Sequence, residues 1–273
     1  MTYDPSTIAL MAGALLVAGA FAGVLAGLLG IGGGIVIVPA LFYLFTLLDI
    51  DPAIKMHLAV GTSLSTIIAT SLSSIRSHHR RGAVDWPLLR SWGPAVAVGV
   101  VIGTVVAGLV SGEVLTGVFA TMALLVAANM AFQPESARLA DRLPGGPVRF
   151  VIGSLIGGFS AMMGIGGGTF TVPTLVMCSY PIRRAVGTAA AVGLIIAVPG
   201  TIGFMIDGYG RPELPPFSLG YVSVLGFVII APMTVMTAPL GARIAHTINT
   251  RWLRWAFALF LALTSLRMYQ SLF

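Results

Sequence analysis

The decamer GIGGGIVIVP at residues 30–39 returns as GIGGGTFTVP at residues 164–173. Each copy has four glycines in five positions, then apolar residues, and a proline at the tenth position. A glycine in a helix interior costs about 1 kcal/mol relative to alanine, so neither decamer favours a continuous helix. Glycines also permit a left-handed backbone and let other atoms approach the main chain closely. We therefore predict one break in the helical structure in each half of the chain.

The composition around the decamers is that of a membrane protein. The 273 residues are 57% hydrophobic and only 9% charged, whereas soluble domains carry about 25% charged residues. Several apolar runs exceed the ~20 residues that span the hydrocarbon core of a bilayer. The net charge of +6 comes from bases in short loops, which favours an orienting role over nucleic-acid binding. We predict an all-α polytopic protein that contacts the lipid bilayer, spanning a bacterial inner membrane.

Charges, prolines and glycine clusters divide the chain into ten apolar segments. Segments 35–48 and 169–180, which follow the glycine motifs, are too short to cross the hydrocarbon comfortably as straight helices. Together with the segment before it, each either crosses fully or dips into the membrane as a re-entrant hairpin, and the sequence leaves both open. The ten segments are residues 8–29, 35–48, 54–75, 87–110, 114–133, 148–163, 169–180, 184–206, 217–242 and 252–272.

The two halves align beyond the glycine motif. AVGTS at residues 59–63 matches AVGTA at residues 185–189. Three matching blocks in the same order predict an internal duplication, with a first repeat at 1–133, a cytoplasmic linker at 134–147 and a second repeat at 148–273. In the third block, Gly103, Leu115, Phe119 and Met130 match Gly241, Leu253, Phe257 and Met268.

The basic residues predict how the two repeats are oriented. If the ten segments alternate in direction, starting outside, twelve of the fifteen bases face the cytoplasm, as the positive-inside rule requires. Five segments per half is an odd number, so the repeats are expected to be inverted, as in many secondary transporters. The cytoplasmic bases are Arg76, Arg80, Arg81, Arg90, Arg138, Arg142, Arg149, Arg183, Arg184, Arg243, Arg251 and Arg254, and the external ones are Lys55, Arg211 and Arg267.

The paired decamers, the AVGT blocks and the C-terminal repeat block together resemble the TauE/SafE family of sulfite-exporter-like membrane permeases. The resemblance covers the whole chain. It implies movement of sulfite, sulfonates or related small sulfur-containing or organic anions, typically outward. The second residue after each AVG departs from symmetry, since Ser63 corresponds to Ala189. The two halves of a substrate site are therefore not expected to be chemically equivalent.

The chemistry of a broken helix predicts where such an anion binds. The first N–H groups of a helix have no intrahelical partners, and the helix dipole places partial positive charge at that end. Two such ends, brought toward one midplane by inverted repeats, make an anion site without a buried arginine. The predicted backbone donors are Gly32, Gly33, Gly34, Gly166, Gly167 and Gly168, and the predicted hydroxyls are Thr62, Ser63, Thr169 and Thr188.

Each of these features also has a purely structural interpretation. The glycines of the decamers could serve tight helix crossings alone, although adjacent glycines do not share a helix face. The hydroxyls could serve hydrogen bonds between helices. Glycines at four-residue spacing, such as Gly19, Gly23, Gly99 and Gly103, predict helix packing rather than a site.

Four residues are candidates for coupling or gating. His57 changes charge near neutral pH and lies near the predicted outer start of segment 54–75, beside Lys55; a hydrated interfacial histidine is the alternative. Pro39 and Pro173 are expected to kink or stop the short helices.

These features together predict a secondary transporter that exports a small anion by alternating access. Uptake or a passive channel for the same anions is the alternative, and a membrane scaffold without transport is a weaker one. We find no paired carboxylates, ligand cluster or nucleophile–base pair at membrane depth, so we predict no enzyme, no metal and no cofactor. The only lysine follows isoleucine, which excludes a phosphate-binding loop of the GxxxxGK type. We leave a homodimer open.

Overall fold

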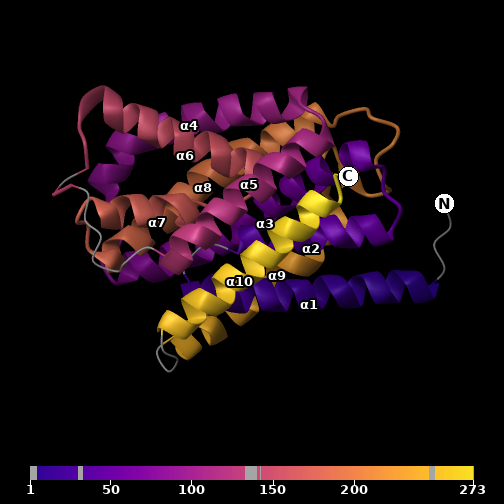
Figure 1. Cartoon of the computed structure of the whole chain (residues 1–273), viewed down its shortest axis with the longest axis horizontal. Coiled ribbons are helices and arrows are strands. Elements are labelled where there is room, and N and C mark those ends of the chain that lie inside the picture. The colour runs from indigo at the N-terminus through magenta and orange to yellow at the C-terminus, as the bar shows by residue number, and fades with distance from the viewer. Residues whose placement is uncertain (1–4, 30–32, 133–139, 142, 246–249, 273) are drawn as a thin grey trace.

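The computed structural model describes residues 5–29, 33–132, 140–141, 143–245 and 250–272 (Figure 1). Within these residues the chain forms ten helices and one two-stranded hairpin. Six of the helices are long and apolar enough to cross a membrane. The chain is therefore an all-α, multi-pass membrane protein, as the composition predicted. Its elements are α1 (Pro5–Leu29), α2 (Gly34–Leu47), α3 (Pro52–Arg80), α4 (Trp86–Leu109), α5 (Gly112–Phe132), α6 (Gly146–Met163), α7 (Gly168–Met177), α8 (Ile182–Asp207), β1 (Ser218–Leu219), β2 (Val222–Ser223), α9 (Val224–Ala245) and α10 (Thr250–Gln270).

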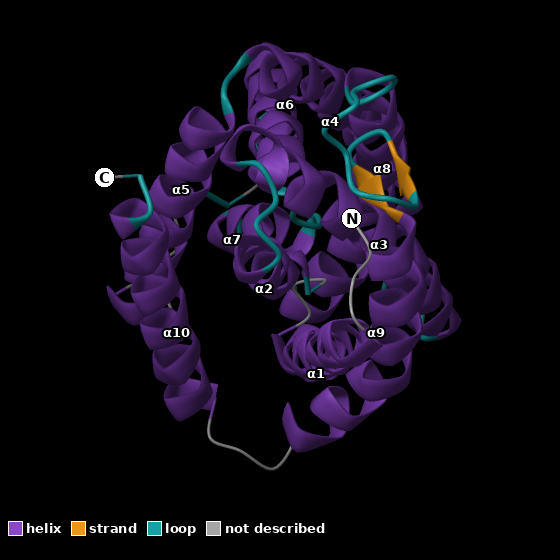
Figure 2. Ribbon diagram, turned by 90° about the vertical axis from the view of Figure 1, so that its right-hand side faces the viewer, coloured by secondary structure: helices purple, strands orange, loops and turns teal. Residues whose placement is uncertain are grey.

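The two helices that follow the glycine motifs are short. With 14 residues in α2 and 10 in α7, a rise of 1.5 Å per residue gives lengths of about 21 and 15 Å, less than the ~30 Å of the hydrocarbon core. Both lie among the longer helices rather than on the outside (Figure 2). The two predicted short segments are thus found where the glycine motifs placed them.

The connection before α9 differs from the prediction. Segment 217–242 was expected to be one apolar helix, but residues 218–223 form the antiparallel β1–β2 hairpin, and α9 begins only at Val224. The backbone N–H of Tyr221 donates to the carbonyl of Phe204, 3.0 Å away on α8. A Cβ on Gly220 would overlap the carbonyl of Met205. The hairpin therefore covers the end of α8 before the chain enters the next helix.

Most of the helix packing joins the first half of the chain to the second. Helix α1 packs along α9, α4 along α6, α5 along α10, and α3 against α8. Helix α2 packs on α3, and α7 packs on α8. Most of the side chains of α2 and the first half of α3 are buried, so the core lies around these two elements. The first glycine motif therefore leads directly into the centre of the molecule.

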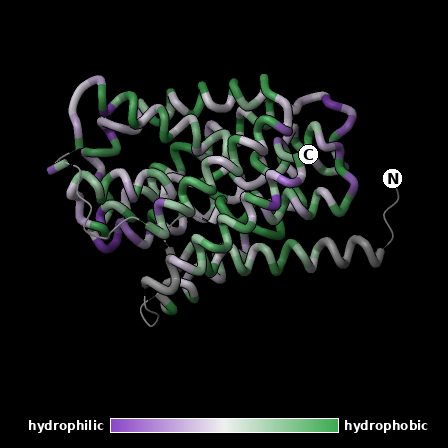
Figure 3. The backbone as a smooth tube through the Cα atoms, in the orientation of Figure 1, coloured by the Kyte–Doolittle hydropathy of each residue, from purple (hydrophilic) through white to green (hydrophobic). Residues whose placement is uncertain are grey.

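Hydrophilic residues gather at the two ends of the helix bundle, and apolar residues fill the stretch between them (Figure 3). One end, here called the arginine-rich end, contains the connections 81–85, 143–145 and 178–181. The opposite end contains the connections 48–51, 110–111 and 208–223. Such a separation is what alternating transmembrane helices with cytoplasmic arginines produce. The bases whose side chains the structure describes are Arg76, Arg80, Arg81, Arg90, Arg149, Arg183 and Arg184 at the arginine-rich end, and Lys55, Arg211 and Arg267 at the opposite end.

The division into repeats stays a prediction. Residues 134–139 and 142 of the predicted linker lie outside the described residues. Ala140, just after them, packs on the end of α7, where its N–H donates to the carbonyl of Met177 at 3.2 Å and its carbonyl accepts from the Ser179 hydroxyl at 3.0 Å.

Candidate functional site

The second glycine motif ends one helix and starts another. Gly164 follows the last residue of α6 with a φ of +65°, a left-handed conformation that glycine adopts at little cost. Its N–H donates to the carbonyl of Ala161 at 3.2 Å, and the N–H of Ile165 donates to that of Ser160 at 3.0 Å. This pair of bonds is the Schellman arrangement that closes a helix C-terminus. Helix α7 then begins at Gly168.

The first motif makes a corresponding break, of which part is described. Residues 30–32, including the predicted donor Gly32, lie outside the described residues. Gly33 has a φ of +75°, and its carbonyl accepts from the N–H groups of Val36 and Ile37 at 3.0 and 3.1 Å. Gly34 is the first residue of α2. Each half therefore contains a short helix that starts at the last glycine of its motif.

The two motifs touch each other in the centre of the molecule. A Cβ on Gly34 would lie 2.6 Å from the carbonyl oxygen of Gly164 and 3.0 Å from Cα of Ile165. The hydroxyl of Ser63, on α3, donates to the same Gly164 carbonyl at 2.7 Å. The structure thus brings together three predicted elements: the start of α2, the turn between α6 and α7, and Ser63.

The remaining glycines of the second motif are buried against α8. Residues 163–169, which include Gly166, are all buried. A Cβ on Gly167 would lie 2.6 Å from the carbonyl of Ala189 and equally close to the amide nitrogen of Gly193. Gly168 is the first residue of α7. The tight packing that we weighed for these glycines is therefore real at Gly167, and it holds the start of α7 directly against α8.

The first turn of α7 carries hydrogen-bonding groups that find no partner among the residues that the structure describes. The first intrahelical bond runs from the N–H of Thr171 to the carbonyl of Gly167 at 3.0 Å, so the N–H groups of Gly168, Thr169 and Phe170 have no intrahelical acceptor. Thr169 is 4% exposed and Thr171 is 0% exposed. Neither hydroxyl has a hydrogen-bond partner within the described residues. Two residues apart in a helix, Thr169 and Thr171 point to different sides of α7, so the positive end of its dipole carries buried donors on more than one side.

Two hydroxyls near this turn were not among the predicted site residues. They belong to Thr171, two residues after Thr169, and to Ser160, in the last turns of α6. Both residues are fully buried, and neither hydroxyl has a hydrogen-bond partner in the described part of the chain. The 134-residue offset between the motifs places Ile37 and Ala26 at the matching positions of the first half. The signal was present in the sequence, since TFT follows the second motif where IVI follows the first.

The threonines of the two AVGT blocks make matching structural contacts. The Thr62 hydroxyl accepts from the backbone N–H of Ser223 at 2.9 Å, just before α9. The Thr188 hydroxyl accepts from the backbone N–H of Asp85 at 3.0 Å, just before α4. Each threonine therefore fixes the start of a helix contributed by the other half of the chain. A substrate role for either stays a prediction.

The glycines of the same blocks allow this contact. A Cβ on Gly61 would overlap the carbonyl of Tyr221, and one on Gly187 would lie 2.5 Å from the carbonyl of Ala83. In both cases the crowded carbonyl is two residues before the residue that the threonine binds. The AVGT sequence is thus a docking point for a chain connection, repeated at the two ends of the molecule.

A charged cluster at the arginine-rich end lies beside Thr188. The Asp85 carboxylate accepts from the N–H of Leu88 at 2.9 Å, accepts from the Tyr180 hydroxyl, and lies 3.5 Å from the guanidinium of Arg184. Burial alone raises the pKa of Asp85, but these three interactions outweigh it and hold the pKa below its usual value. Burial and the neighbouring carboxylate raise the pKa of Tyr180 to about 12. The cluster ties the α3–α4 connection to the start of α8.

We expect the Asp85 cluster to make stability sensitive to acid. Because folding lowers the pKa of Asp85, its contribution is complete above the value of about 3.9 for an unfolded aspartate and is lost as the pH falls through the lower folded value. Asp85→Asn keeps a helix cap but loses the charge, so about 1 kcal/mol of stability at pH 7 should disappear. Melting temperatures between pH 6 and pH 3 test this, and an equal acid-induced decrease in both proteins would contradict it.

The predicted coupling residues at the opposite end are packed inside the protein. His57 is 3% exposed, its Nε2–H donates to the carbonyl of Ala107 at 2.9 Å, and its ring stacks on Tyr221 with centroids 4.9 Å apart. The Lys55 ammonium lies 4.4 Å from the centroid of the Phe42 ring. His57 is therefore not the hydrated interfacial histidine that we considered as its alternative. A coupling role for either residue stays a prediction.

The two motif prolines stop neither short helix. Pro39 and Pro173 are each the sixth residue of their helix, and α2 continues to Leu47 while α7 continues to Met177. A proline has no N–H, so each removes the bond to the carbonyl four residues earlier. In α7 that carbonyl belongs to Thr169. Of the two predicted effects, a stop at the prolines is wrong, while a kink and a gating role stay predictions.

Comparisons with known proteins agree with this architecture. Residues 15–268 match the family model described as "Sulfite exporter TauE/SafE". A probable membrane transporter protein of Haemophilus influenzae is 35% identical over 255 residues, which cover 93% of this chain and 96% of that protein. A probable membrane transporter protein of Methanocaldococcus jannaschii is 28% identical over 250 residues, covering 88% of each chain. No solved structure matches.

Proposed function

Since this chain belongs to the sulfite exporter TauE/SafE family, and is accordingly a membrane transporter, we propose that its substrate is a small anion such as sulfite or an organosulfonate. We further propose secondary transport, in the outward direction, across the inner membrane of a bacterium. The named relatives are probable membrane transporter proteins, and we propose no enzymatic step.

The observation that carries this proposal is the first turn of α7. Three backbone N–H groups without intrahelical acceptors lie there, with the buried hydroxyls of Thr169 and Thr171, which have no partner in the part of the chain that the structure describes. Every one of these groups can donate a hydrogen bond to an oxyanion, and the helix dipole favours negative charge at this end. No acidic side chain is among the buried residues of the described chain, so nothing there competes for the same donors. These features support an anion rather than a cation as the substrate.

The packing of the helices supports transport by two inverted repeats. If α1–α5 correspond to α6–α10, the contact of α1 with α9 corresponds to that of α6 with α4, and the contact of α2 with α3 to that of α7 with α8. The contacts of Gly61 and Thr62 correspond in the same way to those of Gly187 and Thr188. We propose that the halves rock about the contact between Gly34 and Gly164, which exposes the site to each side in turn.

A flux assay with the purified protein tests the proposal. Liposomes loaded with sulfite, or with a small sulfonate, should release it faster than protein-free liposomes of the same lipid. Release at the protein-free rate for every anion tested would overturn the proposal. Acceleration by a pH gradient would indicate a coupled transporter, and flux that is indifferent to any gradient of a second ion would instead favour the passive channel. Right-side-out and inverted vesicles compared under matched gradients separate export from uptake.

Removing either hydroxyl of the α7 turn should impair transport. Thr169→Val and Thr171→Val keep the shape of the side chain but lose a donor to the anion. A hydrogen bond to a charged group contributes about 1.5–3 kcal/mol, so each change should weaken apparent substrate affinity by roughly tenfold or more. The measurement is the concentration dependence of flux in liposomes.

The matched control for these two variants lies one turn further along the same helix. The Thr174 hydroxyl already donates to the carbonyl of Phe170 at 2.7 Å, so Thr174→Val removes a hydroxyl that is satisfied within the protein. It should leave the affinity within about twofold of the wild type. Wild-type affinity in both Thr169→Val and Thr171→Val would remove the α7 turn from the site.

A further inference from the structure

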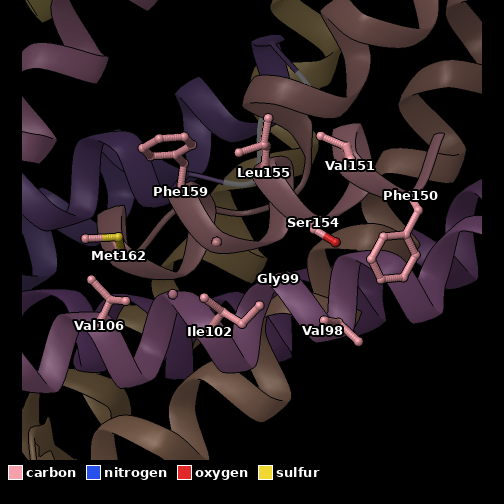
Figure 4. Close-up of a pocket in the computed structure, with 12 residues that line it drawn as sticks. Val98, Gly99, Ile102, Val106, Phe150, Val151, Ser154, Leu155, Phe159 and Met162 are labelled. Carbon is pink, nitrogen blue, oxygen red and sulfur yellow. The ribbon is translucent and has the colours of Figure 1, made fainter. Parts of the chain in front are cut away.

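A groove runs along the outside of the molecule between α4 and α6. It has a volume of about 330 Å³ (Figure 4). Its lining is apolar except for the Ser154 hydroxyl, which donates to the carbonyl of Ala95 at 3.0 Å. We call it the α4–α6 groove; it is lined by Val98, Gly99, Ile102, Gly103, Val106, Phe150, Val151, Ser154, Leu155, Gly158, Phe159 and Met162.

Glycines create the groove by bringing the two helix backbones together. A Cβ on Gly99 would overlap the carbonyl of Ser154, and one on Gly103 would overlap that of Gly158. Backbones in contact form a floor without side chains, and larger apolar residues such as Ile102 and Leu155 stand on either side of it. Both of these side chains are more than half exposed. The groove is therefore open toward the surroundings of the transmembrane bundle.

The length of the groove matches one leaflet of a bilayer. On α6 its lining extends from Phe150 to Met162, which is about 18 Å at 1.5 Å per residue. One leaflet contributes about half of the ~30 Å hydrocarbon core. The groove starts near the arginine-rich end, one residue after Arg149, and extends toward the middle of the membrane. This position suits one acyl chain of a lipid in the leaflet at the arginine-rich end.

A cationic side chain stands at the mouth of the groove. Arg149 bridges the two helices there: its Nε donates to the carbonyl of Pro144 at 3.0 Å, and its Nη1 donates to the Ser91 hydroxyl on α4 at 3.3 Å. A guanidinium has five N–H donors, so these two bonds leave others available. Arg90, beside Ser91 on α4, is exposed and adds a second positive charge. Basic pockets between transmembrane helices on the cytoplasmic side are typical binding sites for anionic headgroups.

We propose that the α4–α6 groove binds an anionic phospholipid, with one acyl chain along the groove and the phosphate on Arg149. A second copy of this chain fits the face less well. A two-fold dimer through the groove would place the same surface on both sides, and so would bring two Arg149 side chains toward each other at one membrane level. A lipid phosphate instead neutralises this arginine.

Native mass spectrometry of the full-length protein tests the proposal. The probe is a mixed micelle with equal amounts of phosphatidylglycerol and phosphatidylcholine. The wild type should retain phosphatidylglycerol preferentially, and Arg149→Gln should lower that preference by about fivefold. Arg76→Gln is the matched control, since Arg76 is exposed at the same end on α3, away from the groove, and this change should leave the preference intact.

A second pair of variants tests the acyl-chain half of the site. Val151→Trp fills the groove and should reduce retention of phosphatidylglycerol, whereas Val105→Trp changes an equally exposed valine of α4 that does not line it. An unchanged preference in Arg149→Gln, or equal loss in both tryptophan variants, would overturn the proposal. So would a wild-type dimer that Val151→Trp converts to a monomer, because the groove would then belong to a second copy. Lipid retention is measured without any flux, so the outcome is independent of the substrate.

Discussion

Gly34→Ala is expected to reduce anion flux by on the order of tenfold or more, because it separates the two glycine motifs. The new Cβ would lie 2.6 Å from the carbonyl oxygen of Gly164 and 3.0 Å from Cα of Ile165, and both of these are backbone atoms that cannot rotate away. A misplacement of about 1 Å at a functional site can reduce its rate by roughly a hundredfold. The measurement is the initial rate of sulfite release from liposomes at equal protein content.

Gly13→Ala is the control for this variant. Nothing lies within 4 Å of a Cβ on Gly13, which is also a helical glycine. This change should leave flux unchanged and slightly favour the helix. Normal flux in a folded, monodisperse Gly34→Ala protein would show that the contact between the motifs is not required for transport.

Alanine at Gly61 and at Gly187 should destabilise the protein by similar amounts, at opposite ends of the molecule. Each Cβ would press on a backbone carbonyl, that of Tyr221 or that of Ala83. Overpacking of this kind typically costs about 1–3 kcal/mol. Each change would also weaken the adjacent threonine bond that fixes the start of α9 or α4. The melting temperature of each purified variant provides the measurement.

The pair is informative because inverted repeats predict that the two effects match. The melting temperature should decrease by a similar amount in both variants and stay unchanged in Gly13→Ala. If only one of the two glycines proved sensitive, the contacts of the AVGT blocks would not be equivalent, and the case for an inverted repeat would lose its main structural support.

Apolar runs and the placement of charges, prolines and glycines predicted most of the helices, including the two short ones. A cluster of adjacent glycines has a local effect on the backbone, so α2 and α7 could be located from the sequence alone. Glycine spacing also identified packing sites correctly: Gly19 lies against Ile230 on α9, and Gly99 against Ser154 on α6. These effects are encoded in a few neighbouring residues.

The features that were missed depend on residues distant in the chain. Thr62 binds a residue 161 positions away and Thr188 one 103 positions away, and nothing in the local sequence distinguishes such a partner from a substrate. The β1–β2 hairpin, likewise, is held at the end of α8 by the bond from the N–H of Tyr221 to the carbonyl of Phe204. Its apolar composition alone favoured a helix. The sequence showed that Thr171 replaces an apolar residue of the first half, but only the structure shows that it and Ser160 are buried with no hydrogen-bond partner among the described residues.

The bond from Ser63 to the carbonyl of Gly164 has a consequence for the balance between conformations. Two identical repeats would make the inward-open and outward-open states equal in energy, so each would be half populated. Position 189, which corresponds to Ser63, is alanine and cannot donate the equivalent bond. A bond of about 1 kcal/mol that forms in only one half favours the state that keeps it by roughly fivefold. Under the proposed rocking of two repeats, one hydroxyl is thus enough to set a preferred resting orientation.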